Sequence, residues 1–352
     1  MDFPLGPVSS RAAERVKRVQ PRARAKRRHL SSPGACFAGL SVEQIWARPD
    51  ALIEEMAATM ETPSGKTAAD ENFPVGSWLL PARLRPHVAT FYAYARAIDD
   101  IADNPDLQPD DKIQRLEGFA AAVRGVDTTS PGFHAAHAIR RSLAATDVTH
   151  QHCLDLVSAF KQDASKLRYE SWNDLISYCN LSAAPVGRYL IDLHGESAAT
   201  YPASDALCNA LQVVNHLQDC GDDFRALNRV YLPQNWMAAE EADVSTLEGR
   251  QATDALRRVL NRCLDATDQL LVRASRLPSQ FQNVHLAMES ATIIAIAKKL
   301  SAELRRRDPL AERVVLTKAQ FLGCGVSGVG HALYQTIPRW LGALASRPSS
   351  VD

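Results

Sequence analysis

The chain has 352 residues, of which 46% are hydrophobic and 23% are charged. These proportions are typical of a soluble globular protein and exclude a mainly disordered chain or one built of membrane-spanning helices. Forty basic residues balance forty acidic ones, so the chain lacks the net positive charge with which proteins bind nucleic acid non-specifically. Nucleic acid is therefore not expected as a partner.

The cysteine pattern and the longest uncharged stretch both indicate a cytoplasmic protein. Seven cysteines are scattered along the chain without a Cys-x-x-Cys pair, so neither a disulfide framework nor a thiolate zinc site is expected. Residues 319–338 carry no charge, but they contain four glycines, one histidine and two glutamines. This composition is too polar for a convincing transmembrane helix.

The N-terminal segment, residues 1–59, differs from the rest of the chain. Within it, residues 11–28 carry nine basic side chains and one acidic one. We expect a disordered extension, with a targeting or surface-binding arm as the alternative. Met60 is an alternative natural start, because the periodic sequence begins only after it. The remaining chain is expected to form one domain over residues 60–345 and a tail over residues 346–352.

Helical spacing of apolar residues, at every third and fourth position, begins at about residue 76 and continues almost throughout the chain. The first clear apolar face consists of Val88, Phe91, Tyr92, Ala95 and Ile98. Prolines separate the helical runs, and no alternating strand pattern stands out. The pattern predicts one all-α domain of about ten helices.

A glycine pattern near the C-terminus has the spacing of a cofactor-binding motif, but we do not expect a cofactor to bind there. Gly323-x-Gly325-x-x-Gly328 fits the dinucleotide-binding spacing, but it lacks the preceding strand and the later acidic residue that such a site needs. We predict a turn here, either flexible or closely packed. NAD(P)H is not expected as a cofactor.

Two aspartate pairs carry the strongest chemical signal: Asp99 with Asp103, and Asp219 with Asp223. The spacing Asp-x-x-x-Asp puts two carboxylates on one helix face, where like charges destabilise a helix by roughly 0.2–0.5 kcal/mol per pair. A sequence that repeats this arrangement indicates a neutralising cation. Mg²⁺ is the natural candidate, since it takes one or two carboxylates and completes its shell with water and phosphate oxygens. The alternative is two solvated acidic helix ends.

The spacing alone is weak evidence, because a third pair has it too. Asp106 and Asp110 flank Pro109 and lie between helix breakers. We predict that this pair belongs to a solvated loop.

The residues around the two strong pairs resemble the two aspartate motifs of squalene and phytoene synthases. The matching segments are residues 91–103 (FYAYARAIDDIAD), 168–169, 178–187, 212–223 (QVVNHLQDCGDD) and 229–233 (RVYLP). They occur in the family's order over about residues 71–320. The resemblance implies an all-α terpenoid synthase fold, with one helical domain around a central cavity and the two aspartate motifs facing each other at its mouth.

The same resemblance implies the metal ligands. Asp99, Asp103, Asp219 and Asp223 would hold Mg²⁺ ions on a diphosphate, and Asn215 would assist the second motif. These four aspartates would be catalytic.

It also implies the residues that bind substrate. Arg96 and Arg229 would bind diphosphate oxygens, a task for which the guanidinium group is suited by its parallel charged donors. Tyr178, Gln212 and Phe73 would line the cavity near the reacting carbons, with Tyr178 as a further catalytic residue. Core packing is the alternative role of Gln212 and Phe73.

Details of the sequence are similar to one branch of the family, the bacterial hydroxysqualene synthases of the hopanoid pathway. The similar segments are residues 71–77, 183–187 and 305–314. The second motif reads Asn-His-Leu-Gln-Asp, where condensing members usually have Asn-Ile-Leu-Arg-Asp. Gln218 thus replaces an arginine beside the expected metal site, and the loss of this cation disfavours the condensation of two diphosphates.

We therefore expect a Mg²⁺-dependent enzyme that converts presqualene diphosphate and water into hydroxysqualene and diphosphate. The resemblance implies a functional link to a presqualene diphosphate synthase and to a flavoenzyme that reduces hydroxysqualene. Since substrate and product are long hydrocarbons, we also expect peripheral contact with the inner face of the cytoplasmic membrane, through the basic arm or the glycine-rich C-terminal segment. Two alternatives remain: a squalene or phytoene synthase that joins two prenyl diphosphates head to head, and a non-catalytic prenyl-lipid binding protein.

Overall fold

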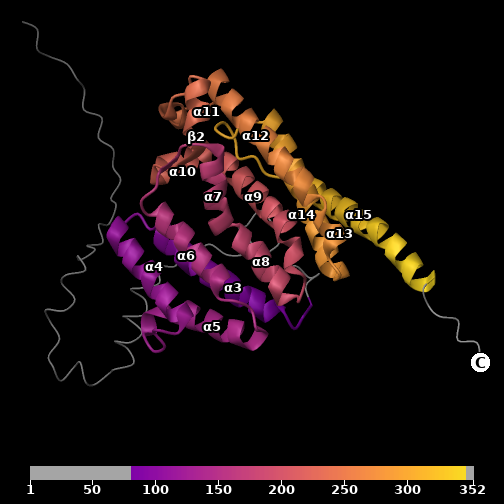
Figure 1. Ribbon diagram of the computed structural model, residues 1–352. Helices are drawn as coiled ribbons and strands as arrows, with labels where there is room; N and C mark the ends of the chain where they lie inside the picture. The colour runs from indigo at the N-terminus through magenta and orange to yellow at the C-terminus, as the bar shows by residue number, and fades with distance from the viewer. Residues whose placement is uncertain (1–80, 346–352) are drawn as a thin grey trace, which may run out of the picture. The chain divides into compact units, whose positions relative to one another are not determined.

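A computed structural model describes residues 81–345 of the chain, and these residues form helices joined by short connections (Figure 1). Two strands of two and four residues are the only extended elements in this part. The prediction of an all-α domain is therefore confirmed. Phe73 and the expected domain boundary at residue 60 lie outside the described residues.

Four helices in the first half of the described chain share one apolar core. They are α3 (Arg85–Asp103), α4 (Pro109–Arg124), α5 (His134–Thr146) and α6 (Gln151–Asp163). On α3, Val88, Phe91 and Ile98 are buried as predicted, and Tyr94 is buried with them. Packing of this face fixes the rotation of α3, so the position of its last turn, which carries the first aspartate motif, is set by the core.

The second half is organised around α9 (Tyr201–Gln218), which packs against α7, α8, α12 and α14. The other helices of this half are α7 (Trp172–Ser182), α8 (Ala184–Leu193), α10 (Cys220–Leu227), α11 (Gln234–Ala239), α12 (Asp254–Ala274), α13 (Leu277–Gln280), α14 (Val284–Arg306) and α15 (Lys318–Ala345). At Gly187 of α8, a Cβ atom would lie 2.4 Å from Oγ of Ser204, so only glycine permits this close approach of α8 to α9.

The two strands form a parallel pair that the sequence pattern did not reveal. β1 (Arg168–Tyr169) follows α6, and β2 (Val230–Pro233) follows α10. Arg168 pairs with Val230 and Tyr169 with Pro233, with an irregularity between the two positions. The pair joins the segment after α6 to the segment after the second aspartate motif.

Two local predictions were wrong. The glycines at 323–328 lie inside α15 and not in a turn; close packing is nevertheless present, since a Cβ at Gly328 would lie 2.5 Å from Cα of Thr292 on α14. Asp110 belongs to the first turn of α4, which begins at Pro109, because proline is well suited to the first position of a helix. The Asp106 and Asp110 side chains are exposed, as expected of a solvated pair.

Among the described residues, no helix combines the length and the apolar character needed to span a membrane.

Candidate functional site

The first aspartate motif occupies the last turn of α3, where an arginine one turn earlier pairs with it. Nη1 of Arg96 lies 3.0 Å from Oδ2 of Asp99, and its Nη2 lies 2.9 Å from Oδ1 of Asp100. Asp100 is buried, whereas the Asp99 side chain is 29% exposed. Arg96, predicted to bind diphosphate, therefore lies at the motif and partly offsets its negative charge.

The carboxylates of this motif are crowded. Burial, and then the charge of Asp103, raise the pKa of Asp99 to about 8. A carboxyl group that holds its proton so strongly lies in a place where a further positive charge would be stabilising. Its oxygens are the hard ligands that Mg²⁺ prefers.

The second motif lies where α9 meets α10. The backbone N–H of Asp219 donates to the carbonyl of Asn215 at 3.0 Å, and that of Asp223 donates to the carbonyl of Asp219 at 2.8 Å. The three residues thus follow one another at intervals of one helical turn, on the same side of the helices. Burial, Asp219 and then Asp103 raise the pKa of Asp223 to about 7. Since Asp103 contributes, the two motifs lie within electrostatic reach of each other.

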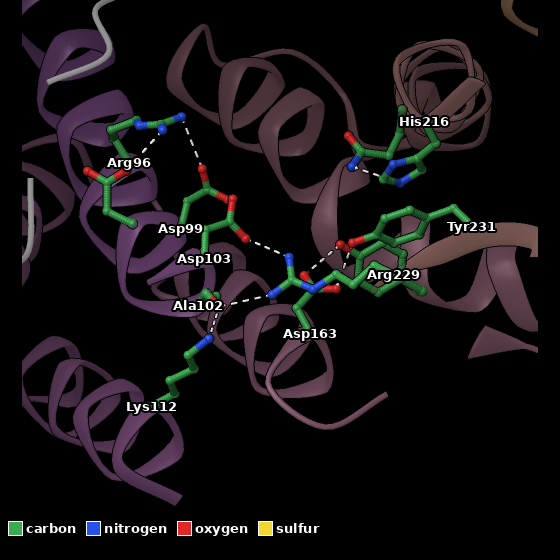
Figure 2. Close-up of polar contacts among 12 residues, drawn as sticks. Arg96, Asp99, Ala102, Asp103, Lys112, Asp163, His216, Arg229 and Tyr231 are labelled. Atoms are coloured by element: carbon green, nitrogen blue, oxygen red, sulfur yellow. Dashed lines mark hydrogen bonds and ion pairs between the residues drawn. The ribbon is translucent and has the colours of Figure 1, made fainter. Parts of the chain in front are cut away.

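Arg229 contacts both motifs, and Figure 2 shows its side-chain bonds to the first one. Its Nη1 lies 2.5 Å from Oδ1 of Asp103, and its Nη2 donates to the carbonyl of Ala102 at 2.9 Å. Its backbone N–H donates to the carbonyl of Asp223 at 3.2 Å. α10 ends at Leu227, and the following Asn228, with a φ of 52°, reverses the chain before Arg229 and β2. One residue thus contacts both of the aspartate motifs that the sequence separates.

A further acidic residue, Asp163 at the end of α6, was missed by the sequence reasoning. It is 4% exposed and accepts hydrogen bonds from the hydroxyls of Tyr178, at 2.7 Å, and Tyr231, at 3.1 Å. Burial raises its pKa to about 6, although Arg229 acts in the opposite direction. The only signal in the sequence was an acidic residue in line with the buried Leu156 and Ala159 on the apolar face of α6.

Gln212 and Tyr178, both predicted to line the cavity, lie near a buried aromatic cluster. Tyr178 is 2% exposed, with its ring centroid 5.6 Å from that of Tyr231. The side-chain nitrogen of Gln212 lies 3.2 Å from Nε2 of His216, one turn along α9. Burial and the charge of Arg229 lower the pKa of His216 to about 3, so the ring is neutral and can accept a hydrogen bond from the Gln212 amide.

Gln218 lies beside Asp219 in the sequence, but its side chain is engaged elsewhere. The amide is buried and donates from Nε2 to the carbonyl of Val314 at 2.6 Å, in the connection between α14 and α15. Its neutral amide therefore supports the packing of this connection.

Within residues 81–345, no three His, Cys, Asp or Glu side chains lie close enough to be recognised as a metal-binding group. A pair of carboxylates suffices for Mg²⁺, because water and phosphate oxygens complete its shell. The crowded carboxylates of the two motifs therefore suit such an ion.

Helices that bring two aspartate motifs together around an arginine define a terpenoid synthase fold. The family model described as squalene/phytoene synthase matches residues 66–320. The chain belongs to the squalene/phytoene synthase family.

Relatives and solved structures agree with this assignment. Hydroxysqualene synthase of Rhodopseudomonas palustris is 43% identical over 267 residues, 76% of this chain and 90% of the relative. That of Zymomonas mobilis subsp. mobilis is 41% identical, over 77% of this chain and 91% of the relative. The crystal structure of squalene synthase HpnC from Alicyclobacillus acidocaldarius is similar with a TM-score of 0.59 and 30% identity, over 72% of this chain and 93% of that chain. A dehydrosqualene synthase with a bound ligand, at 19% identity and a TM-score of 0.65, covers 81% of this chain and 99% of that chain and shares the fold.

Proposed function

We propose that this protein is a hydroxysqualene synthase, which converts presqualene diphosphate and water into hydroxysqualene and diphosphate. The observation that carries the proposal is the 41–43% identity to three hydroxysqualene synthases over about three-quarters of the chain. A 15-cis-phytoene synthase of Enterobacter agglomerans is 28% identical over a shorter part. The arginine-bridged aspartate motifs support a reaction in which a diphosphate leaves.

The metal assignment is part of the same proposal. Asp99 and Asp103 would hold Mg²⁺ at the end of α3, and Asp219 and Asp223 would hold it at the junction of α9 and α10, with Asn215 assisting. The raised pKa values of Asp99 and Asp223 support this assignment. When bound, Mg²⁺ would stabilise the negative charge that develops on the departing diphosphate.

The chain's own cations would share that task. Arg96 and Arg229 each present a guanidinium group at the first motif, held in place by carboxylates. Exchange of a carboxylate partner for a diphosphate oxygen keeps such a group charge-compensated. Both arginines would then orient the leaving group without moving far.

The carbon skeleton would lie against Tyr178, Gln212 and Phe73. As the bond between carbon and diphosphate oxygen breaks, the cation left behind rearranges and opens to an allylic cation. The oxygen of a water molecule then forms the new bond to carbon, and its proton leaves to solvent or to diphosphate. No hydride donor takes part, so NAD(P)H is not required.

Product analysis tests the proposal. Purified protein with Mg²⁺ and presqualene diphosphate should release a triterpene alcohol that carries ¹⁸O when the reaction is run in H₂¹⁸O, and NADPH should leave the product unchanged. Formation of squalene on addition of NADPH would contradict the hydration reaction. A requirement for farnesyl diphosphate would indicate a condensing synthase, and release of diphosphate from neither substrate would indicate a prenyl-lipid binding protein.

The cellular setting is also proposed. A presqualene diphosphate synthase would supply the substrate, and a flavoenzyme would reduce the product.

We propose peripheral contact with the inner face of the cytoplasmic membrane, supported by the exposed Phe321, Leu322 and Val326 on α15. Sedimentation of the wild type and of Leu322→Ser with anionic liposomes, at low and at high salt, tests this contact. The variant should be retained less than the wild type, and equal retention of the two proteins would argue against a role of α15.

A further inference from the structure

Two cations converge on one carbonyl group at the end of α3. Nζ of Lys112 donates to the carbonyl of Ala102 at 2.8 Å, and Nη2 of Arg229 donates to the same oxygen at 2.9 Å (Figure 2). Burial, and then the charge of Arg229, lower the pKa of Lys112. The repulsion between these cations has to be offset by nearby negative charge.

Two carboxylates supply that charge, and they differ in what else they can do. Asp103 bonds Arg229 directly, but its side chain is 36% exposed, so it can reach solvent and ligands. Asp163 is 4% exposed and is fixed by the hydroxyls of Tyr178 and Tyr231. Figure 2 shows Arg229 bonded to Asp103, with Asp163 bonded to the tyrosine hydroxyls near the same guanidinium group. Burial disfavours the charged guanidinium, yet nearby acidic groups, among them Asp163 and Asp103, outweigh this effect and raise the pKa of Arg229.

A conflict follows when Asp103 acts as a metal ligand before a diphosphate oxygen has replaced it beside Arg229. The Asp103 oxygen that binds Arg229 would be drawn towards the cation, while the Arg229 side chain, which is 7% exposed, cannot move freely into water. A buried charge that loses its partner is strongly destabilising. Asp163 is placed to prevent this, because its position does not depend on the metal.

We propose that Asp163 is a positioning residue: it is the buried counter-ion that keeps Arg229 in place when Asp103 exchanges the guanidinium for a divalent cation. This inference rests on the function proposed above, which assigns Asp103 to the metal. The two tyrosine hydroxyls fix the Asp163 carboxylate near Arg229, where its charge acts on the guanidinium group without a direct ion pair.

A Mn²⁺ titration of the full-length protein, followed by the electron paramagnetic resonance signal of free Mn²⁺, tests the proposal without measuring turnover. Asp163→Asn keeps the shape and one acceptor oxygen but removes the charge. We expect its Mn²⁺ dissociation constant to be about tenfold or more above that of the wild type, since metal binding then leaves Arg229 uncompensated. An unchanged dissociation constant would overturn the proposal.

The chain offers a matched control. Asp192 also accepts a tyrosine hydroxyl, that of Tyr201 at 2.5 Å, and pairs with Nε2 of His152 at 2.7 Å. These partners belong to neither aspartate motif. Asp192→Asn should bind Mn²⁺ like the wild type; a loss equal to that of Asp163→Asn would show a general effect of removing a tyrosine-bound carboxylate and would overturn the proposal.

A double variant separates an action through Arg229 from a direct effect on the metal. In Arg229→Gln, Asp103 has no competing guanidinium group, so adding Asp163→Asn should change Mn²⁺ affinity little further. A loss that persists in this background would show that Asp163 acts on the metal by its charge alone, and the positioning role would be wrong.

A crystal structure of the wild type with Mn²⁺ and inorganic diphosphate needs no variant and decides the matter if Asp163→Asn does not fold. We expect Asp103 on the metal and the guanidinium group of Arg229 still beside Asp163, no farther from its carboxylate than in the metal-free protein. An Arg229 turned away from Asp163 would overturn the inference. Wild-type protein that binds no Mn²⁺ would instead refute the metal assignment of the proposed function, and the inference would fall with it.

Discussion

The imidazole of His216 and the phenol ring of Tyr231 are stacked, with centroids 3.6 Å apart and planes 8° from parallel. The contact joins α9, which carries the second aspartate motif, to β2, which follows Arg229. Because the ring is buried, a charge on it would be costly, and its pKa is lowered to about 3 by burial and then by Arg229. The stack therefore exists with a neutral imidazole over the whole range in which the protein would work.

This stack predicts a specific acid sensitivity. The pKa of a histidine is near 6.5 in the unfolded chain, whereas that of folded His216 is about 3. The free energy of unfolding therefore contains the full contribution of the neutral ring above about pH 6.5. This contribution falls by roughly 1.4 kcal/mol per pH unit as the pH drops towards 3. His216→Phe keeps an aromatic ring and removes the titration. Denaturant unfolding at pH 7.5 and pH 5 should show a smaller loss of stability in the variant than in the wild type. His285→Gln, at an exposed histidine, serves as the control and should behave like the wild type; equal losses in all three proteins would contradict the prediction.

The aspartate motifs predict opposite effects on activity and stability. Asp99→Asn and Asp219→Asn should each lower turnover by several orders of magnitude, because each removes a proposed metal ligand. Relief of like-charge repulsion should leave the fold as stable as before or more stable, by at least the roughly 0.2–0.5 kcal/mol per pair of a solvated helix, and by more for Asp99 as the pH rises. Diphosphate release and thermal unfolding measure the two effects. Asp106→Asn, at an exposed aspartate, should change neither.

The same motif gives a pH dependence with a definite sign. Asp99 has a pKa of about 8 in the folded protein and near 4 when unfolded, so the folded state binds the extra proton between these values. The protonated Asp99 carboxyl therefore contributes fully to the free energy of unfolding below about pH 4. This contribution is lost as the pH rises to about 8. Metal-free Asp99→Asn should therefore gain stability over the wild type as the pH rises from 5 to 8. A constant difference across this range would show that Asp99 is not protonated in the folded state.

Close packing of α15 on α14 predicts that two glycines in one helix respond in opposite ways. A Cβ at Gly328 would lie 2.5 Å from Cα of Thr292, whereas one at Gly323 meets nothing within 4 Å. Gly328→Ala should destabilise the protein by about 1–3 kcal/mol. Gly323→Ala should stabilise it by roughly 0.5–1 kcal/mol, because alanine loses less entropy in a helix. Denaturant unfolding compares them, and similar values for both would show that α15 is not held against α14 at this point.

Gln218 predicts a loss of stability without a loss of metal binding. Its amide satisfies the buried carbonyl of Val314, so Gln218→Leu leaves that oxygen unpaired at a cost of about 1–3 kcal/mol. Mn²⁺ affinity should remain that of the wild type. A weakened metal site in a stable Gln218→Leu protein would place the side chain's role at the second motif instead.

Helical spacing in the sequence predicted that the members of each aspartate pair lie together, while the resemblance to the family added Arg96 and Asn215. Arg96 and Asp99 lie on one turn of α3, and Asn215, Asp219 and Asp223 follow at intervals of one turn. Asp163 could not be found in this way. Its partners Tyr178 and Tyr231 lie on other elements, and a lone acidic residue at the end of an amphipathic helix is normally read as part of the solvated surface.

The wrong predictions have equally physical causes. The turn expected at residues 323–328 was inferred from the conformational freedom of glycine, but Gly328 is used in α15 for its lack of a side chain, at a contact with Thr292. β1 is two residues long, which is too short for any alternation of apolar and polar positions to appear. Gln218 takes the place of an arginine in the family's second motif, and the structure adds a bond that the motif did not reveal, from its amide to the carbonyl of Val314.

The pairing of Arg168 with Val230 has a kinetic consequence. The helices on either side can form from contacts between residues close in the sequence, whereas the pairing of β1 with β2 and of Arg229 with Asp103 joins segments separated by several helices. Contacts between distant segments form slowly, because a long loop must close before they contribute. During refolding, far-ultraviolet circular dichroism should therefore recover before the protein regains its capacity to bind Mn²⁺, and the newly made chain would pass through a helical but inactive stage.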